Sequence, residues 1–332
     1  MKRCSKCVLP ESFPGISFNS EGVCSICTGF DRQKTNKLSE GKLRDRLDEI
    51  IKESQSVNLQ YDGLAAFSGG KDSTYLIYTL KKKYNLRILA FTFDNGFMPE
   101  SAFTNMRNVL SKLNVDHIIF KPEQKFVNDI FKTSADKDIY PESLLKFGSA
   151  ICISCIRMIN NLSLKTAIEK KIPMVFLGNS PGQIIQSENE IIYRDNRIPY
   201  EFKEGLFKPL ADILGEKVYN YVLLNKEDYK AKPFPYIINL FPIIGYDEDI
   251  IKDTISKLSW RRPEEVDPNT SNCQLNALGI IKHMKRLGFH PYDYEMSMLV
   301  RLGKITRDEA LRRVEDPEGT TEKLAKKCQE ML

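Results

Sequence analysis

A short glycine-rich turn has the residue types that bind phosphate. It consists of Ser68, Gly69, Gly70, Lys71, Asp72 and Ser73. The two glycines let the backbone approach an anion closely, the serine hydroxyls are donors, and the lysine adds a positive charge. Apolar residues 64–67 precede the turn as a short strand, and residues 74–80 follow it with helical spacing. A strand, a glycine-rich turn and a helix N-terminus together predict a phosphate cradle.

Eight cysteines occur in the chain, and four of them have the spacing of a metal site. These four are Cys4, Cys7, Cys24 and Cys27. A C-x2-C turn directs two thiolates at one point, and two such turns complete a tetrahedral sulfur shell. So short a segment cannot bury a core of its own. We therefore predict a structural Zn²⁺ that stabilises it.

A second group joins Cys152 and Cys155, again spaced C-x2-C, with the distant Cys273. Spacing alone leaves two interpretations open, namely a shared chemical site or a buried pair with an unrelated thiol. Cys152 and Cys155 precede the helix expected at 160–171. Cys328 lies in a lysine-rich tail and is expected to be an incidental thiol.

Composition excludes several classes of protein. The 332 residues are 42% apolar and 28% charged, with a net charge of +5, which permits a nucleic-acid or nucleotide partner without a polybasic arm. The most apolar stretch, 234–246, contains Pro235 and Pro242 and is too short to cross a bilayer. No apolar run follows the first charged residues. We therefore expect a cytoplasmic protein with reduced thiols and no membrane partner.

Strand and helix patterns alternate around the glycine-rich turn. Further strands are expected at 87–93, 116–120 and 174–177, with helices at 101–113 and 160–171. This alternation predicts an α/β fold with a doubly wound parallel sheet, which binds ligands at the C-terminal ends of its strands. Asp94 and Gly178 follow two of these strands directly.

The Ser68–Ser73 sequence, SGGKDS, resembles the PP-loop of the N-type ATP pyrophosphatases. The resemblance implies an adenine nucleotide alpha hydrolase-like fold and an enzyme that splits ATP between the α- and β-phosphates, adenylating a substrate oxygen. It also implies that the loop residues hold ATP, that Asp72 is catalytic and helps to place Mg²⁺, and that Asp94 and Gly178 lie near the nucleotide.

Within that superfamily, a C-x2-C pair with a late cysteine resembles the iron–sulfur-dependent tRNA thiolases. The resemblance implies that Cys152, Cys155 and Cys273 are catalytic and hold a [4Fe-4S] cluster, with one iron unligated by protein and able to carry sulfide. Redox thiols remain the alternative for these three residues. The implied reaction is thiolation of tRNA or of a small nucleotide-like substrate, with a sulfur donor as a further partner.

The two ends of the chain resemble a different family, the N-acetyl sugar amidotransferases. The similar segments are 3–10, 13–18, 22–27 and 300–310. The resemblance implies a PP-loop enzyme that uses ammonia instead of sulfur. No glutaminase is expected in this chain, so a partner glutaminase would supply the ammonia. A third interpretation, an RNA-binding module without catalysis, conflicts with the intact SGGKDS sequence.

These patterns divide the chain into four parts. The expected parts are a zinc ribbon (1–30), a helical linker (31–60, with its helix at 38–54), a PP-loop ATP pyrophosphatase domain (61–258) and a C-terminal helical region (259–332). The sequence leaves open whether the protein forms a homodimer.

Outside the main motifs, a few residues carry separate expectations. Trp260, beside two arginines, could stack on a base or pack on the core. His117 is expected to be structural. Further helices are expected at 247–258, 279–287 and 305–314, the last capped by Thr306.

Overall fold

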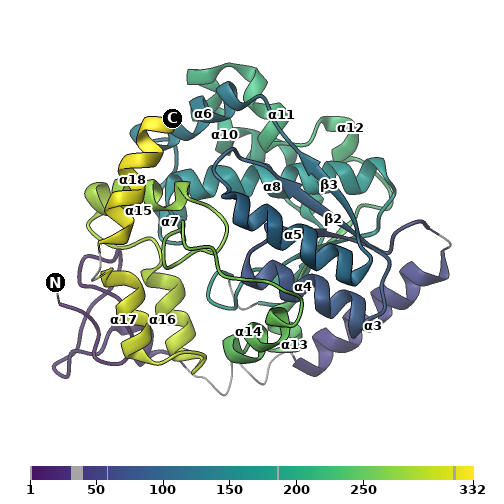
Figure 1. Cartoon of the computed structure of the whole chain (residues 1–332). Coiled ribbons are helices and arrows are strands. Elements are labelled where there is room, and N and C mark those ends of the chain that lie inside the picture. The colour runs from purple at the N-terminus through teal and green to yellow at the C-terminus, as the bar shows by residue number, and fades with distance from the viewer. Residues whose placement is uncertain (1, 31–39, 58, 185–186, 317–318) are drawn as a thin grey trace.

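The protein is built around one twisted sheet (Figure 1). The computed structural model describes residues 2–30, 40–57, 59–184, 187–316 and 319–332. In the described residues the strand order is β3-β2-β1-β4-β6-β5, and every neighbouring pair is parallel except β5 with β6. The strands are β1 (Gly63–Ala66), β2 (Ile88–Phe93), β3 (Asp116–Phe120), β4 (Met174–Leu177), β5 (Ile192–Tyr193) and β6 (Tyr236–Asn239).

The central strands are apolar because both faces of the sheet are covered. Successive side chains of a strand point to opposite faces. Leu64 of β1 and Val175 of β4 therefore belong to one hydrophobic core, whereas Ala65 and Phe176 belong to the other. Strands buried on both faces lose the polar alternation of a half-exposed sheet.

Helices form a layer on each face of the sheet. One layer contains α3 (Glu40–Ser56), α4 (Lys71–Lys82), α5 (Glu100–Leu113), α13 (Phe241–Ile244) and α14 (Glu248–Ser256). The other contains α6 (Gln124–Asp136), α8 (Ala150–Glu169), α10 (Tyr200–Leu214) and α11 (Tyr219–Val222), together with α15 (Leu275–Leu287) and α18 (Thr320–Met331). This arrangement confirms the predicted doubly wound α/β fold.

The strand order places the ends of β1 and β4 side by side. From β1 the chain adds β2 and β3 on one side, and it then adds β4 and β6 on the other. Ligands of such sheets bind where the direction of winding reverses, outside the carboxyl ends of the strands. The turn after β1 and the segment after β4 meet at this position.

The C-terminal helices hold the N-terminal cysteine module. This module, which includes α1 (Ser25–Thr28), lies beside α16 (Asp293–Arg301) and α17 (Arg307–Glu315) (Figure 1). Arg3 pairs with the buried Asp293 at 2.6 Å, and the Val8 N–H donates to Ser297 Oγ at 3.3 Å. Thr306 caps α17 by accepting from the Glu309 N–H, which confirms the predicted cap.

Short elements complete the described chain. They are α7 (Glu142–Leu145), α9 (Glu188–Ile191), α12 (Lys226–Tyr229) and the 3₁₀ helices Asp195–Arg197 and Glu216–Val218.

In the described ranges, no helix is both long and apolar enough to span a membrane.

One helix begins earlier than the sequence predicted. The helix expected at 160–171 is α8, which starts at Ala150, so Cys152 and Cys155 lie inside it and not before it. Ser149 is the reason, because its hydroxyl accepts from the Cys152 N–H at 3.2 Å and caps the helix there. The linker helix expected at 38–54 is α3, and residues 38 and 39 lie outside the described residues.

Candidate active site

The SGGKDS turn lies at the carboxyl end of β1 and starts α4 at Lys71. Gly69 has a φ of +69°, and a Cβ at this position would lie 2.8 Å from the Ala102 carbonyl oxygen. Only glycine fits there. Gly70 is the N-cap and has no capping side chain, so the first N–H groups of α4 have no intrahelical acceptor. The turn therefore presents a row of N–H donors suited to an anion.

Two serines and a neighbouring glycine shape this turn. The Ser68 N–H donates to Ser73 Oγ at 3.3 Å, and the two hydroxyl oxygens are 3.1 Å apart. Gly178, directly after β4, lies against the same turn, because a Cβ added there would be 3.3 Å from the Ser73 nitrogen. The structure thus brings the predicted residues Ser68, Ser73 and Gly178 together.

Trp260 supports the turn from outside. Its indole N–H donates to the Gly69 carbonyl at 2.8 Å, and its ring packs against the core beneath α4. Asn105 holds the next residue by exchanging two hydrogen bonds with the Arg261 backbone, at 2.7 and 3.0 Å. Of the two roles considered for Trp260, packing on the core is the one observed.

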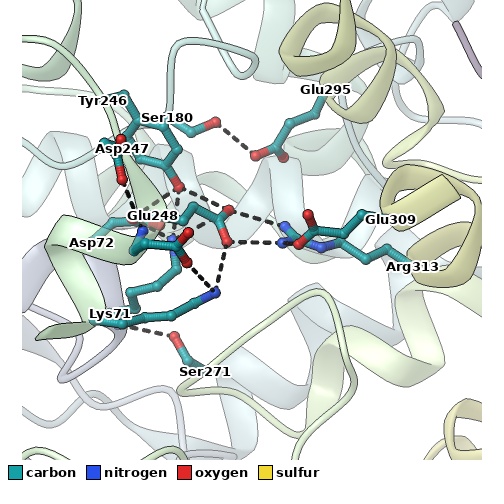
Figure 2. A network of polar contacts seen from close by, with 12 residues as sticks. Lys71, Asp72, Ser180, Tyr246, Asp247, Glu248, Ser271, Glu295, Glu309 and Arg313 are labelled. Carbon is teal, nitrogen blue, oxygen red and sulfur yellow. Dashed lines mark hydrogen bonds and ion pairs between the residues drawn. The ribbon is translucent and has the colours of Figure 1, made fainter. Parts of the chain in front are cut away.

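Lys71 is held in a network that the sequence did not predict (Figure 2). Its ammonium lies 2.7 Å from Asp72 Oδ1, 2.7 Å from the Tyr246 hydroxyl and 3.6 Å from Glu248 Oε1. Arg313 of α17 binds both oxygens of Glu248, at 3.0 and 2.8 Å. The network thus joins the turn to α14 and α17.

Two carboxyl groups near Lys71 differ in their pKa. Burial opposes ionisation of Glu248, but Arg313 and Lys71 outweigh it and lower its pKa to about 2. Glu295 of α16 accepts from the Ser180 hydroxyl at 2.7 Å, yet burial raises its pKa to about 7. Glu248 is therefore ionised at neutral pH, whereas Glu295 is protonated in about half of the molecules.

A pocket with a volume of about 290 Å³ opens between the turn and the cysteine-bearing segments. Its lining includes Ser68, Gly70, Lys71, Asp72, Ser73, Asn95, Cys152, Cys155, Gly178, Asn179, Thr270, Ser271, Asn272 and Cys273. Asp94 is not in the lining that the described residues form. Its carboxylate accepts from the Gly96 N–H at 3.0 Å and lies 4.0 Å from Lys121, while the adjacent Asn95 faces the pocket.

The three cysteines of the second group meet in this pocket. Asn95 Nδ2 lies 3.7 Å from Cys155 Sγ and 3.4 Å from Cys273 Sγ, and the Cys152 thiol donates to Asn276 Oδ1 at 3.4 Å. The three cysteines are not among the groups of described residues that could hold a single metal ion. Three thiols that line one pocket are soft donors, and an iron–sulfur cluster is a group with which such donors are chemically compatible.

Desolvation keeps these thiols protonated. It raises the pKa of Cys152 to about 12, and it raises the pKa of Cys155 and Cys273 as well. Cys328 is buried in α18, where desolvation raises its pKa to about 11, and it does not line the pocket that the described chain forms. The three pocket thiols therefore need a bound cationic group to become thiolates.

The four N-terminal cysteines form a compact sulfur site. Their ligand atoms all lie within 4.8 Å of one another. Cys7 Sγ and Cys24 Sγ are 3.8 Å apart, which matches the edge of a tetrahedron with Zn–S bonds of about 2.3 Å. The Cys24 N–H points at Cys4 Sγ at 3.2 Å, and the Cys27 N–H points at Cys24 Sγ at 3.4 Å. Such donors stabilise thiolates, so the site fits a metal ion.

A buried arginine complements the charge of this sulfur site. Arg301 Nη1 lies 3.5 Å from Cys7 Sγ and 3.8 Å from Cys27 Sγ. Its Nε and Nη2 atoms are buried and have no hydrogen-bond partner in the part of the chain that is described. Four thiolates around a divalent ion carry a net negative charge, and a buried guanidinium is stable beside such a charge. This arrangement is a second indication that the site holds a metal.

Comparisons with known proteins place few constraints on the reaction. No protein-family profile matches the sequence. An uncharacterized protein of Methanocaldococcus jannaschii is 23% identical over 316 residues, which are 95% of this chain and 94% of that protein. One of the subunits of the glutamine-hydrolyzing GMP synthase of Sulfurisphaera tokodaii is 25% identical over 188 residues, 55% of this chain and 48% of that protein.

Similar solved structures include three enzymes. A tRNA thiolase from Methanococcus maripaludis with its [4Fe-4S] cluster has a TM-score of 0.38 and 13% identity, covering 100% of this chain and 88% of that chain. The NH₃-dependent NAD synthetase of Campylobacter jejuni has a TM-score of 0.32 and 16% identity over 72% and 100% of the two chains. The NMN synthetase of Francisella tularensis has a TM-score of 0.31 and 11% identity over 82% and 96%.

Proposed function

We propose that this protein is an ATP-dependent sulfurtransferase that forms AMP and pyrophosphate. The observation that carries the proposal is one shared pocket, in which Cys152, Cys155 and Cys273 lie beside the phosphate-binding turn. An enzyme that activates a carbonyl oxygen and then replaces it with sulfur needs both groups within reach of one substrate atom.

The turn supplies the activation step. The N–H groups at the start of α4, the Ser68 and Ser73 hydroxyls and Lys71 hold the ATP phosphates. Asp72 helps to place Mg²⁺, whose charge offsets that of the departing pyrophosphate. The substrate carbonyl oxygen attacks the α-phosphorus, pyrophosphate leaves, and the nucleophile then displaces AMP from the adenylated carbon.

The cysteines supply the sulfur chemistry. When Cys152, Cys155 and Cys273 bind a [4Fe-4S] cluster, the group provides an iron without a protein ligand at which sulfide is held. Asn95 positions two of these sulfurs from the end of β2. The N-terminal module holds Zn²⁺ in a closed, structural site. A reducing cytoplasm is part of the proposal, because oxidation would remove the thiolates.

The substrate is tRNA or a small nucleotide-like molecule, and a separate donor renews the sulfur. The net charge of +5 supports a polyanionic substrate without requiring one. AMP formation with total tRNA, compared with AMP formation with free nucleotides under the same conditions, separates the two classes.

The deciding experiment is a metal and sulfide analysis of protein purified without oxygen. We expect about four irons with matching acid-labile sulfide and about one zinc per chain. Cys273→Ala should lose the iron, the sulfide and the thiolated product, whereas Cys328→Ala should keep all three because Cys328 lies outside the pocket. Zinc alone, even after cluster reconstitution, would exclude the sulfur-transfer proposal.

Amidation is the second candidate function. It is supported by the similarity to part of a glutamine-hydrolyzing GMP synthase and by the resemblance of both chain ends to sugar amidotransferases. Here the turn acts as before, and ammonia supplied by a partner glutaminase attacks the adenylated carbon of an N-acetyl sugar. Ammonia-dependent AMP release by iron-free protein would favour this reaction, and its absence with active cluster-loaded protein would exclude it.

A further inference from the structure

The segment that carries Cys273 lies directly over the phosphate-binding turn. The Ser271 hydroxyl accepts from the Lys71 N–H at 3.0 Å (Figure 2). A Cβ added to Gly70 would be 3.0 Å from Ser271 Oγ and 3.1 Å from Asn272 Oδ1. Ser271 therefore touches the turn at the first residue of α4, although it is far from the turn in sequence.

The Lys71 N–H is one of the donors that a bound phosphate requires. The first backbone bond of α4 runs from the Thr74 N–H to the Gly70 carbonyl, so the N–H groups before Thr74 have no partner within the helix. Ser271 Oγ accepts from the first of these donors. A phosphate oxygen that takes this N–H must displace the hydroxyl. Because a serine hydroxyl can also donate, the displaced group can then donate to the phosphate.

The segment around Ser271 is short and fixed at both ends. Asn269 at its start is held by Asp267 Oδ1 at 2.8 Å and by the Arg313 carbonyl at 2.8 Å. At its end, the Gln274 N–H donates to the Phe97 carbonyl at 2.9 Å. Only residues 270–273 lie between these anchors. Because so short a segment cannot absorb the movement, a displacement of Ser271 also moves the backbone of Cys273.

We propose that Ser271 is a nucleotide-phosphate contact that reports occupancy of the turn to Cys273. Phosphate binding breaks the Lys71–Ser271 hydrogen bond, moves residues 270–273 and changes the exposure of the Cys273 sulfur. This inference rests on the proposed function, because it requires the turn to bind a nucleotide phosphate. It makes Ser271 a positioning residue for Cys273, so that this thiol changes its surroundings only after the nucleotide has bound.

The test measures alkylation of individual cysteines by iodoacetamide in cluster-free, full-length protein, located by mass spectrometry. The probe is α,β-methylene ATP with Mg²⁺, and its affinity is measured separately by calorimetry. In the wild type we expect saturating nucleotide to change the Cys273 rate by about threefold or more. Ser271→Ala should still bind the nucleotide within about tenfold of the wild-type affinity but lose the change at Cys273. Ser256→Ala, an exposed serine at the end of α14, is the matched control and should respond like the wild type.

The outcomes separate the inference from the function beneath it. If the wild type binds nucleotide and the Cys273 rate does not change, the inference is overturned and nucleotide binding stands. If Ser271→Ala keeps the full change in the alkylation rate of Cys273, the nucleotide acts on the sulfur directly. Ser271 then does not couple nucleotide binding to Cys273. If the wild type binds no nucleotide, the inference and the proposed function both fail.

Discussion

At the scale of single residues, Glu295 shows how burial creates a titrating group that no motif marks. Its carboxyl group accepts from Ser180, and the charges of Asp72 and Lys71 act on it with opposite sign. Desolvation dominates and raises its pKa from 4.5 to about 7. Gln183 also hydrogen-bonds this group and, like Ser180, favours the charged form. Folded protein therefore keeps a proton on Glu295 over a pH range in which unfolded chain has lost it.

This proton difference predicts a pH-dependent stability. Because the folded pKa is raised, the contribution of Glu295 to stability is full below about pH 4.5 and declines as the pH rises to about 7. Above pH 7 both states are ionised and the contribution is constant. We expect urea unfolding of the wild type to lose stability relative to Glu295→Gln across this window. Parallel pH profiles for the two proteins would contradict the prediction.

At the scale of elements, α17 connects the cysteine module to the SGGKDS turn. Arg307, at its first residue, donates to the Cys4 and Cys7 carbonyls at 3.1 and 2.9 Å. Arg313, near its last turn, binds Glu248, which lies 3.6 Å from the Lys71 ammonium. One helix thus contacts the backbone of the cysteine module at one end and the Lys71 network at the other.

This connection predicts the effect of a single substitution in α17. Arg313→Met leaves the buried Glu248 paired with Lys71, at 3.6 Å, and with the more exposed Lys252, at 3.5 Å. The stronger demand on Lys71 draws its ammonium away from the phosphates. We expect a loss of about 3 kcal/mol in the free energy of unfolding, together with weaker nucleotide binding. Arg312→Met is the control, because Arg312 is exposed on the same helix and should change neither quantity. Equal nucleotide affinity in the two variants would mean that Glu248 does not compete for Lys71.

At the scale of the whole molecule, the N-terminal module stabilises the C-terminal helices on which it lies. Phe13 packs on Phe289 with ring centroids 5.1 Å apart, and the Ser12 hydroxyl donates to the Gly288 carbonyl at 2.7 Å. These contacts depend on the folded cysteine module, because residues 2–30 contain only one short helix, α1, in the described chain. A metal bound by the four cysteines would therefore stabilise a larger unit than the module.

Removal of the metal should consequently lower the melting temperature of the whole protein. We expect a strong chelator to reduce it by several degrees and added Zn²⁺ to restore it, since metal binding to such sites contributes folding free energy. Cys24→Ser should melt at the lower temperature and show almost no further response to chelator. Unchanged melting of the wild type after verified metal loss would show that the sulfur site does not stabilise the fold.

Structural features that depend only on neighbouring residues could be predicted from the amino-acid sequence. An apolar strand followed by Ser68–Ser73 was sufficient for the turn and the start of α4, because glycine conformation and unpaired helix N–H groups are local properties. The alternation of strands and helices was sufficient for the doubly wound sheet. The C-x2-C spacing was sufficient to identify the sulfur site that the four N-terminal cysteines form.

The residues that complete the site from distant parts of the chain could be identified only after the chain had folded. Sheet order and the docking of the C-terminal helices bring Asn95 to Cys273, Arg313 to Glu248 and Ser271 to Lys71. No periodicity marks these residues, because each contact joins segments that are far apart in the chain. Their positions depend on which hydrophobic faces pack together. That packing is set only when the two cores form on either side of the sheet.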